Sequence, residues 1–169
     1  MEQINLRMTH ALTERKGIKG EVRIITRRAG TDEILRTTAW MPNLIMRGTN
    51  TGIDLLLDAL AGTYAGTLGL AYGEIGTGNT APAITDTALT TPTARAALAY
   101  SAVSGATLTV QYFYPDAALT NTTYKEFGTF VGGTATIGTG SLFNHILFSS
   151  NYVKSAGEDT TVEVQFTIT

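Results

Sequence analysis

Residues 160–168 read TTVEVQFTI, and this stretch decides the fold class because apolar and polar side chains alternate along it. A period of two sends successive side chains to opposite faces of a β-strand. Val162, Val164, Phe166 and Ile168 are therefore predicted to face a core. The intervening Thr, Glu and Gln side chains are predicted to lie on the other face of the strand.

Similar patterns recur along the rest of the chain. Residues 20–27 and 34–41 predict a first hairpin, with turn residues at 28–32 between them. About eight strands with turns at this spacing predict a mainly β chain, folded as an antiparallel β-sandwich or a jelly-roll-like domain. The remaining strands are predicted at residues 68–75, 96–103, 107–114, 124–131, 142–148 and 160–168.

One short α-helix is predicted at about residues 50–61. Thr49, Asn50 and Thr51 can cap its N-terminus, and Gly62 stands where a C-terminal glycine cap is expected. Residues 1–18 are predicted to form an N-terminal arm, and residues 19–169 a single domain. The helix repeats apolar side chains at i, i+3, i+4 and i+7, which predicts packing on a sheet: Ile53, Leu56, Leu57 and Leu60.

The composition excludes several kinds of chemistry. The chain has no cysteine, which excludes disulfides, cysteine-based zinc sites and thiol catalysis. Thirty threonines and 18 glycines, with only 15% charged residues, are typical of exposed β-strand faces and turns. No apolar stretch approaches the roughly 18 residues of a membrane span, and residues 1–5, MEQIN, lack a basic region followed by an apolar one, so no membrane anchor or signal peptide is expected.

Charge is distributed unevenly. Residues 1–47 hold nine Lys and Arg against five acids (+4), and the remaining residues hold three against nine (−6). A basic N-terminal segment on an acidic body predicts docking on an acidic partner or a neighbouring subunit, although a solvated face gives the same pattern. The residues predicted to make such contacts are Arg7, Arg15, Lys16, Arg23, Arg27, Arg28, Tyr112, Phe113 and Tyr114.

The aromatic run Tyr112–Tyr114 favours self-association over nucleic-acid binding. Stacking platforms for nucleic acids need a basic groove, and no Lys or Arg surrounds this run. Alternation sends Tyr112 and Tyr114 to one side and Phe113 to the other, so one set is predicted to face the core and the other a covered surface. The chain is therefore predicted to form a homo-oligomer.

Residues 75–82, IGTGNTAP, match the glycine spacing of a dinucleotide-binding loop. Pro82 disfavours a helix there, and the next residues lack a helical period, so we expect an ordered loop with no nucleotide or other cofactor. Arg95 is predicted to bond loop carbonyls or a carboxylate such as Asp86, and Arg95→Ala to cost about 1 to 3 kcal/mol. The predicted structural loop residues are Gly76, Gly78, Pro82, Asp86 and Arg95.

Candidate catalytic and metal-binding residues are few. His10 and His145 are the only histidines, and His145 lies in an apolar stretch that favours a hydrogen-bonded core or interface imidazole. Residues 158–159, Glu-Asp, fit a tight turn better than a calcium loop. No catalytic, cofactor or metal residue is predicted, and the chain is expected not to be an enzyme. A carbohydrate-binding module using Trp40 or exposed tyrosines and a hydrolase with converging carboxylates remain alternatives.

The same motif carries a resemblance. IGTGNTAP at 75–82, DTAL at 86–89 and Arg95 are followed by KEFGTF at 125–130, LFN at 142–144, LFS at 147–149 and the final strand. This order, over residues 43–169, is similar to a family of small minor structural proteins of tailed bacteriophages. Members often place a Glu shortly before the arginine, whereas Thr93 and Ala94 precede Arg95 here.

The resemblance implies a non-enzymatic virion protein that is assembled in the host cytoplasm. The expected role is a capsid decoration (cement) protein that stabilises the head by binding the major capsid protein. Because decoration proteins sit on threefold or quasi-threefold positions of a capsid, the resemblance implies that the homo-oligomer is a trimer. A tail or tail-fibre-associated adaptor that binds tail proteins is the alternative. Neither role involves nucleic acid or a membrane.

Overall fold

The structure is a computed structural model that describes residues 17–169, so the predicted arm, apart from its last two residues, lies outside the described residues. Arg7, Arg15, Lys16 and His10 lie outside them as well. The elements are β1 (Ile18–Arg28), β2 (Ile34–Thr37), β3 (Met41–Ile45), α1 (Gly52–Ala61), β4 (Leu70–Gly76), β5 (Pro92–Ser104), β6 (Thr107–Tyr114), the 3₁₀ helix η1 (Asp116–Ala118), β7 (Thr123–Val131), β8 (Ser141–Val153) and β9 (Glu158–Ile168).

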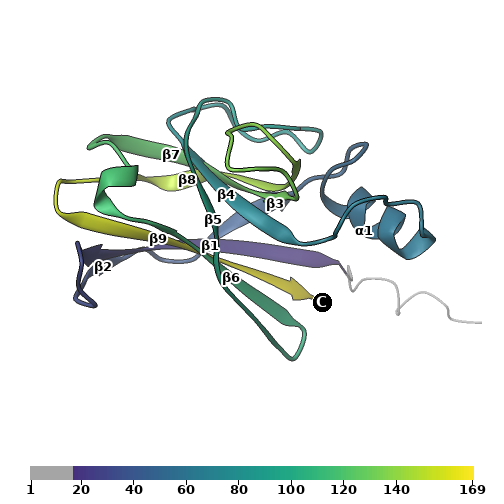
Figure 1. Ribbon diagram of the computed structural model, residues 1–169, viewed down its shortest axis with the longest axis horizontal. Coiled ribbons are helices and arrows are strands. Elements are labelled where there is room, and N and C mark those ends of the chain that lie inside the picture. Colours follow the sequence, from purple (N-terminus) through teal and green to yellow (C-terminus); the bar gives the residue numbers. More distant parts are fainter. Residues whose placement is uncertain (1–16) are drawn as a thin grey trace, which may run out of the picture.

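Eight of the strands close into an antiparallel β-barrel (Figure 1). They pair in the order β1-β3-β8-β7-β4-β5-β6-β9, and β9 pairs with β1 from Ile18–Ile168 to Arg28–Glu158. β2 pairs only with β1. Over residues 17–169 the predicted mainly β, antiparallel class with one α-helix is confirmed, but the strands form one closed barrel instead of the two separate sheets of a sandwich or jelly roll.

Two strands account for the closure. β5 pairs with β4 up to Ala97 and with β6 from Leu98 onward, and its pairing with β6 shifts register between Leu98 and Tyr100. Such irregularities bend a strand and let a sheet curl. The predicted strand 34–41 is interrupted, since the Thr38 hydroxyl accepts the Ile24 N–H at 2.9 Å, and β3 then leaves β1 to pair with β8.

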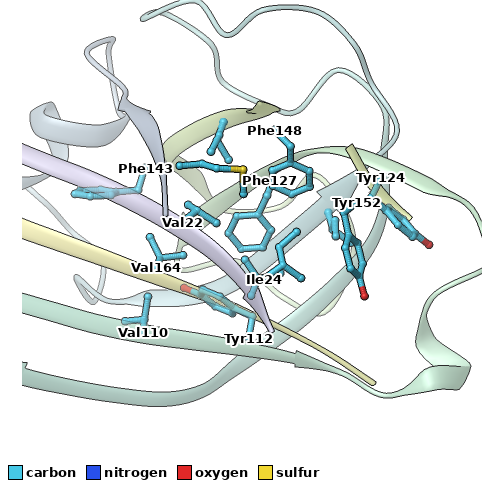
Figure 2. Close-up of a cluster of buried hydrophobic side chains, with 14 of the residues drawn as sticks. Val22, Ile24, Val110, Tyr112, Tyr124, Phe127, Phe143, Phe148, Tyr152 and Val164 are labelled. Carbon is cyan, nitrogen blue, oxygen red and sulfur yellow. The ribbon is translucent and has the colours of Figure 1, made fainter. Parts of the chain in front are cut away.

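The barrel interior is filled by large apolar side chains (Figure 2). As predicted, Tyr112 and Tyr114 are fully buried, whereas Phe113 points outward and is 43% exposed. Val162, Val164 and Phe166 of β9 are also buried, but Ile168 is exposed at the barrel end. Labelled core residues in Figure 2 are Val22, Ile24, Val110, Tyr112, Tyr124, Phe127, Phe143, Phe148, Tyr152 and Val164.

The predicted helix is confirmed as α1, which ends at Gly62 with a left-handed φ of 71°. The expected packing of Leu57 and Leu60 is wrong, since they are 58% and 86% exposed and Leu55 is the buried leucine. α1 packs beside β8 at one end of the barrel (Figure 1), so only part of its apolar surface is covered. Within residues 17–169, no helix is long and apolar enough to cross a membrane.

Candidate functional site

Glu126 on β7 fixes the long loop between β4 and β5. Its buried carboxylate accepts hydrogen bonds from the backbone N–H groups of Gly78, Thr90 and Thr91, at 3.1, 2.9 and 2.6 Å. These amides come from both ends of the loop, so a single side chain holds the two ends together. A buried charge is tolerated when its hydrogen bonds are satisfied, and the loop amides satisfy this one.

The glycines of this loop are needed because the chain passes close to Glu126. A Cβ atom on Gly76 would lie 2.4 Å from the Thr91 carbonyl oxygen, and one on Gly78 would lie 2.4 Å from Glu126 Oε1. The amides that a phosphate would require instead face an internal carboxylate. This arrangement agrees with the structural role predicted for the loop.

His145 on β8 joins the same loop to β7. Its Nδ1 lies 2.9 Å from Asp86 Oδ2, and its Nε2 lies 3.1 Å from Glu126 Oε2. Asp86 also accepts the N–H of Ala83 at 2.9 Å, while Pro82 is half-buried in the same loop. The predicted hydrogen-bonded core imidazole is confirmed. Because both ring nitrogens are engaged and the ring is buried, neither is free to bind a substrate or a metal ion.

Glu126 and His145 shift each other's pKa values toward the ionised forms. Burial alone would lower the pKa of His145, but hydrogen bonds and charge from Glu126 and Asp86 outweigh it and raise the pKa above 6.5. Burial alone would raise the pKa of Glu126, but His145 and the loop amides outweigh it and lower the pKa below 4.5. The surroundings of His145 therefore favour the charged imidazolium more than water does.

The cluster predicts a pH dependence of stability. A raised His145 pKa gives stabilisation that is complete below pH 6.5 and is lost as the pH rises through the folded-state pKa. The lowered pKa of Glu126 gives stabilisation present above pH 4.5 and lost as the pH falls through its folded-state pKa. Urea unfolding of the wild type should therefore show a decline above pH 6.5 that His145→Gln lacks. Parallel profiles for the two proteins between pH 6 and 9 would contradict this prediction.

Arg95 and Glu74 form a second buried cluster, beneath the loop between β7 and β8. The two side chains make an ion pair that is almost fully buried. Arg95 donates to the carbonyl oxygen of Thr139, and Glu74 accepts the N–H of Gly138, both at 2.7 Å. The guanidinium also lies 4.4 Å from the ring centroid of Tyr72, a favourable cation–π arrangement.

The partner predicted for Arg95 is only partly right. Arg95 does bond a loop carbonyl, but that carbonyl belongs to the loop after β7, and the carboxylate is Glu74 instead of Asp86. Asp86 bonds His145. A Glu next to Arg95 in sequence is unnecessary because β4 and β5 are paired and place Glu74 opposite Arg95.

Residues 158–159 also have structural partners. They begin β9 instead of lying in the preceding turn. Glu158 accepts a hydrogen bond from Arg36 at 2.7 Å, and Asp159 accepts the backbone N–H groups of Gly30 and Asp116 at 2.9 and 2.7 Å. Among residues 17–169, no group of three His, Cys, Asp or Glu side chains is placed to hold a metal ion.

The predicted basic contact residues on β1 have intramolecular partners. Trp40 lies against Arg23, with the guanidinium carbon 4.6 Å from the ring centroid. Arg23 donates a hydrogen bond to Glu163, Arg27 to Thr161 and Arg28 to Glu33. Contacts of these three arginines with another protein remain a prediction.

One end of the barrel is apolar and exposed. Val103 at the end of β5 and Ile168 at the end of β9 are 75% and 68% exposed, and Leu68 is also exposed. They surround a cavity of about 380 Å³ that is lined almost entirely by apolar side chains, including Leu56 of α1. Clustered exposed aliphatic side chains mark a surface for contact with another apolar group.

Sequence reasoning missed the two carboxylates that organise the loops, Glu74 and Glu126. Each is a single acid in a strand otherwise rich in apolar residues and glycine, at 70–76 and 123–131. A single acid among apolar residues could have marked Glu74 and Glu126 as important, because an acid in a buried strand needs a specific partner. Comparisons with protein families, curated proteins and solved structures find no match for the chain.

Proposed function

We propose that the protein is a non-enzymatic structural protein of a tailed-bacteriophage virion, and that it decorates the capsid. The observation that carries the proposal is the exposed apolar barrel end on a rigid, internally bonded domain. Leu68, Val103 and Ile168 present aliphatic surface that a neighbouring protein can bury. Such burial provides the main driving force for association.

The residues that resemble the phage family support the proposal because their roles are architectural. Gly76 and Gly78 permit close contact with Glu126, Asp86 holds His145, and Arg95 holds the loop after β7. The motif therefore fixes the shape of two loops. A motif conferring shape suits a protein whose task is to present a defined surface in an assembly.

The loops support the same role through rigidity. Both loops are hydrogen-bonded to buried charged side chains. The loop between β4 and β5 is bonded to Glu126, and the loop between β7 and β8 is bonded to Glu74 and Arg95. A preorganised surface loses little conformational entropy when it binds. Decoration of a capsid requires many equivalent contacts of this kind.

Fractionation of purified particles tests the proposal. Particles of the phage that encodes the chain are separated into DNA-filled heads and tails, and the protein is quantified in each by mass spectrometry. We expect many copies per head and lower thermal stability of heads that lack the protein. Recovery with tails alone would replace decoration by a tail-associated role, and absence from purified particles would contradict a virion role altogether.

A further inference from the structure

The apolar cavity lies at the point where the described chain begins. Gly17 and Thr169 exchange backbone hydrogen bonds of 3.0 and 2.9 Å, and Ile18 lines the cavity. Residues 1–16 are therefore attached at the cavity rim. The principal apolar side chains around the cavity are Ile18, Leu56, Leu68, Val103, Phe166 and Ile168.

The sequence of the attached segment suits an apolar slot. Residues 4–9 read INLRMT, so Ile4, Leu6 and Met8 alternate with polar side chains. In an extended chain this pattern gives one continuous apolar edge. Residues 1–16 hold three bases and two acids (+1), and residues 17–169 hold nine and 12 (−3), so the charges of the two parts are complementary.

We propose that the cavity of one subunit receives Ile4, Leu6 and Met8 of a second copy of the chain. β1 runs into the barrel from Ile18, which lines the cavity, and residue 16 is bonded to Gly17 at the same end. To enter its own cavity the chain would have to reverse within residues 9–16, THALTERK, which contain no Gly, Pro, Asn or Asp. Gly17 is already held by Thr169.

The length of the segment permits exchange between subunits. Sixteen extended residues reach roughly 50 Å, which is enough to cross to a neighbour. Each subunit both donates a segment and receives one, so two subunits that exchange segments form a closed dimer, and a head-to-tail arrangement closes as a ring. This geometry gives a physical route to the homo-oligomer that the sequence predicts, and it does not depend on the virion role.

Charge-introducing variants of the full chain test the exchange. The test variant, Leu6→Asp with Met8→Asp, places two charges on the apolar edge. The control variant, Asn5→Asp with Thr9→Asp, places the same two charges on the polar positions between them. In sedimentation the wild type and the control should be oligomeric, and the association of the test variant should be weakened by more than about tenfold. On the cavity side, Val103→Asp should act likewise, whereas Val153→Asp, at another exposed valine, should not.

A mixing experiment separates exchange from docking within one subunit. The chain with Leu6→Asp and Met8→Asp keeps an intact cavity, and the Val103→Asp chain keeps an intact segment. Their mixture should form a complex that neither forms alone. A monomeric wild type, a mixture that stays monomeric, equal effects of variant and control, or a small apolar molecule found in the cavity by native mass spectrometry would each overturn the proposal. Because the isolated protein is measured, the result is independent of where the chain lies in a particle.

Discussion

Arg95→Ala is expected to lower the free energy of unfolding by about 3 to 5 kcal/mol, the usual cost of removing one partner from a buried ion pair. The substitution leaves the fully buried Glu74 carboxyl without its cationic partner, and it removes the donor to the Thr139 carbonyl oxygen. The loss exceeds the 1 to 3 kcal/mol expected from sequence because that range applies to a single hydrogen bond, whereas the structure shows a desolvated ion pair. Chemical unfolding measures it directly.

Arg28→Ala is the matched control for this prediction. Arg28 also pairs with a glutamate, Glu33, but both side chains are exposed, so water replaces the lost contact and stability should barely change. A second variant, Arg95→Met with Glu74→Gln, removes both charges and should recover part of the loss. Equal stability of Arg95→Ala and Arg28→Ala would show that the buried pair does not hold the fold.

Glu126→Ala should be comparably destabilising, by about 3 to 5 kcal/mol. It leaves the N–H groups of Gly78, Thr90 and Thr91 and one nitrogen of the buried His145 without their acceptor. A buried group left unpaired costs about 1 to 3 kcal/mol, and the losses are less than additive because the loop can open to water. Hydrogen exchange should therefore show loss of protection at these three amides.

Two variants sharpen the interpretation of Glu126→Ala. Glu126→Gln keeps one acceptor oxygen in place and should lose less stability than Glu126→Ala. Glu21→Ala removes a glutamate from an exposed position on β1 and should leave stability and exchange unchanged. If the loop amides remain protected in Glu126→Ala, the carboxylate is not what orders the loop.

Local patterns predicted most of the strands but not their closure. The period of two identified β6 and β9, and it placed Tyr112 and Phe113 on opposite faces. Closure depends on β1 pairing with β9 at the far end of the sequence and on the shift between Leu98 and Tyr100. Neither feature can be predicted from local periodicity, because both depend on which strands pair across long sequence separations.

Local sequence also could not identify the long-range partners within the two buried clusters. The glycines and Arg95 were recognisable as parts of an ordered loop, whereas the partners of Arg95 and Gly78 lie 21 and 48 residues away. Charge and spacing could not choose between Asp86 and Glu74, since strand register decides which carboxylate faces the guanidinium. The exposed faces of α1 were likewise unpredictable, because amphipathicity does not show how much of a helix is covered.

A density map of the intact phage particle tests the proposed function most directly. We expect eight-stranded barrels arranged on the outer capsid surface, with the apolar end that bears Val103 and Ile168 buried against neighbouring protein. Density for the barrel in the tail would contradict capsid decoration. A particle map with no such barrel anywhere would contradict the assignment to the virion.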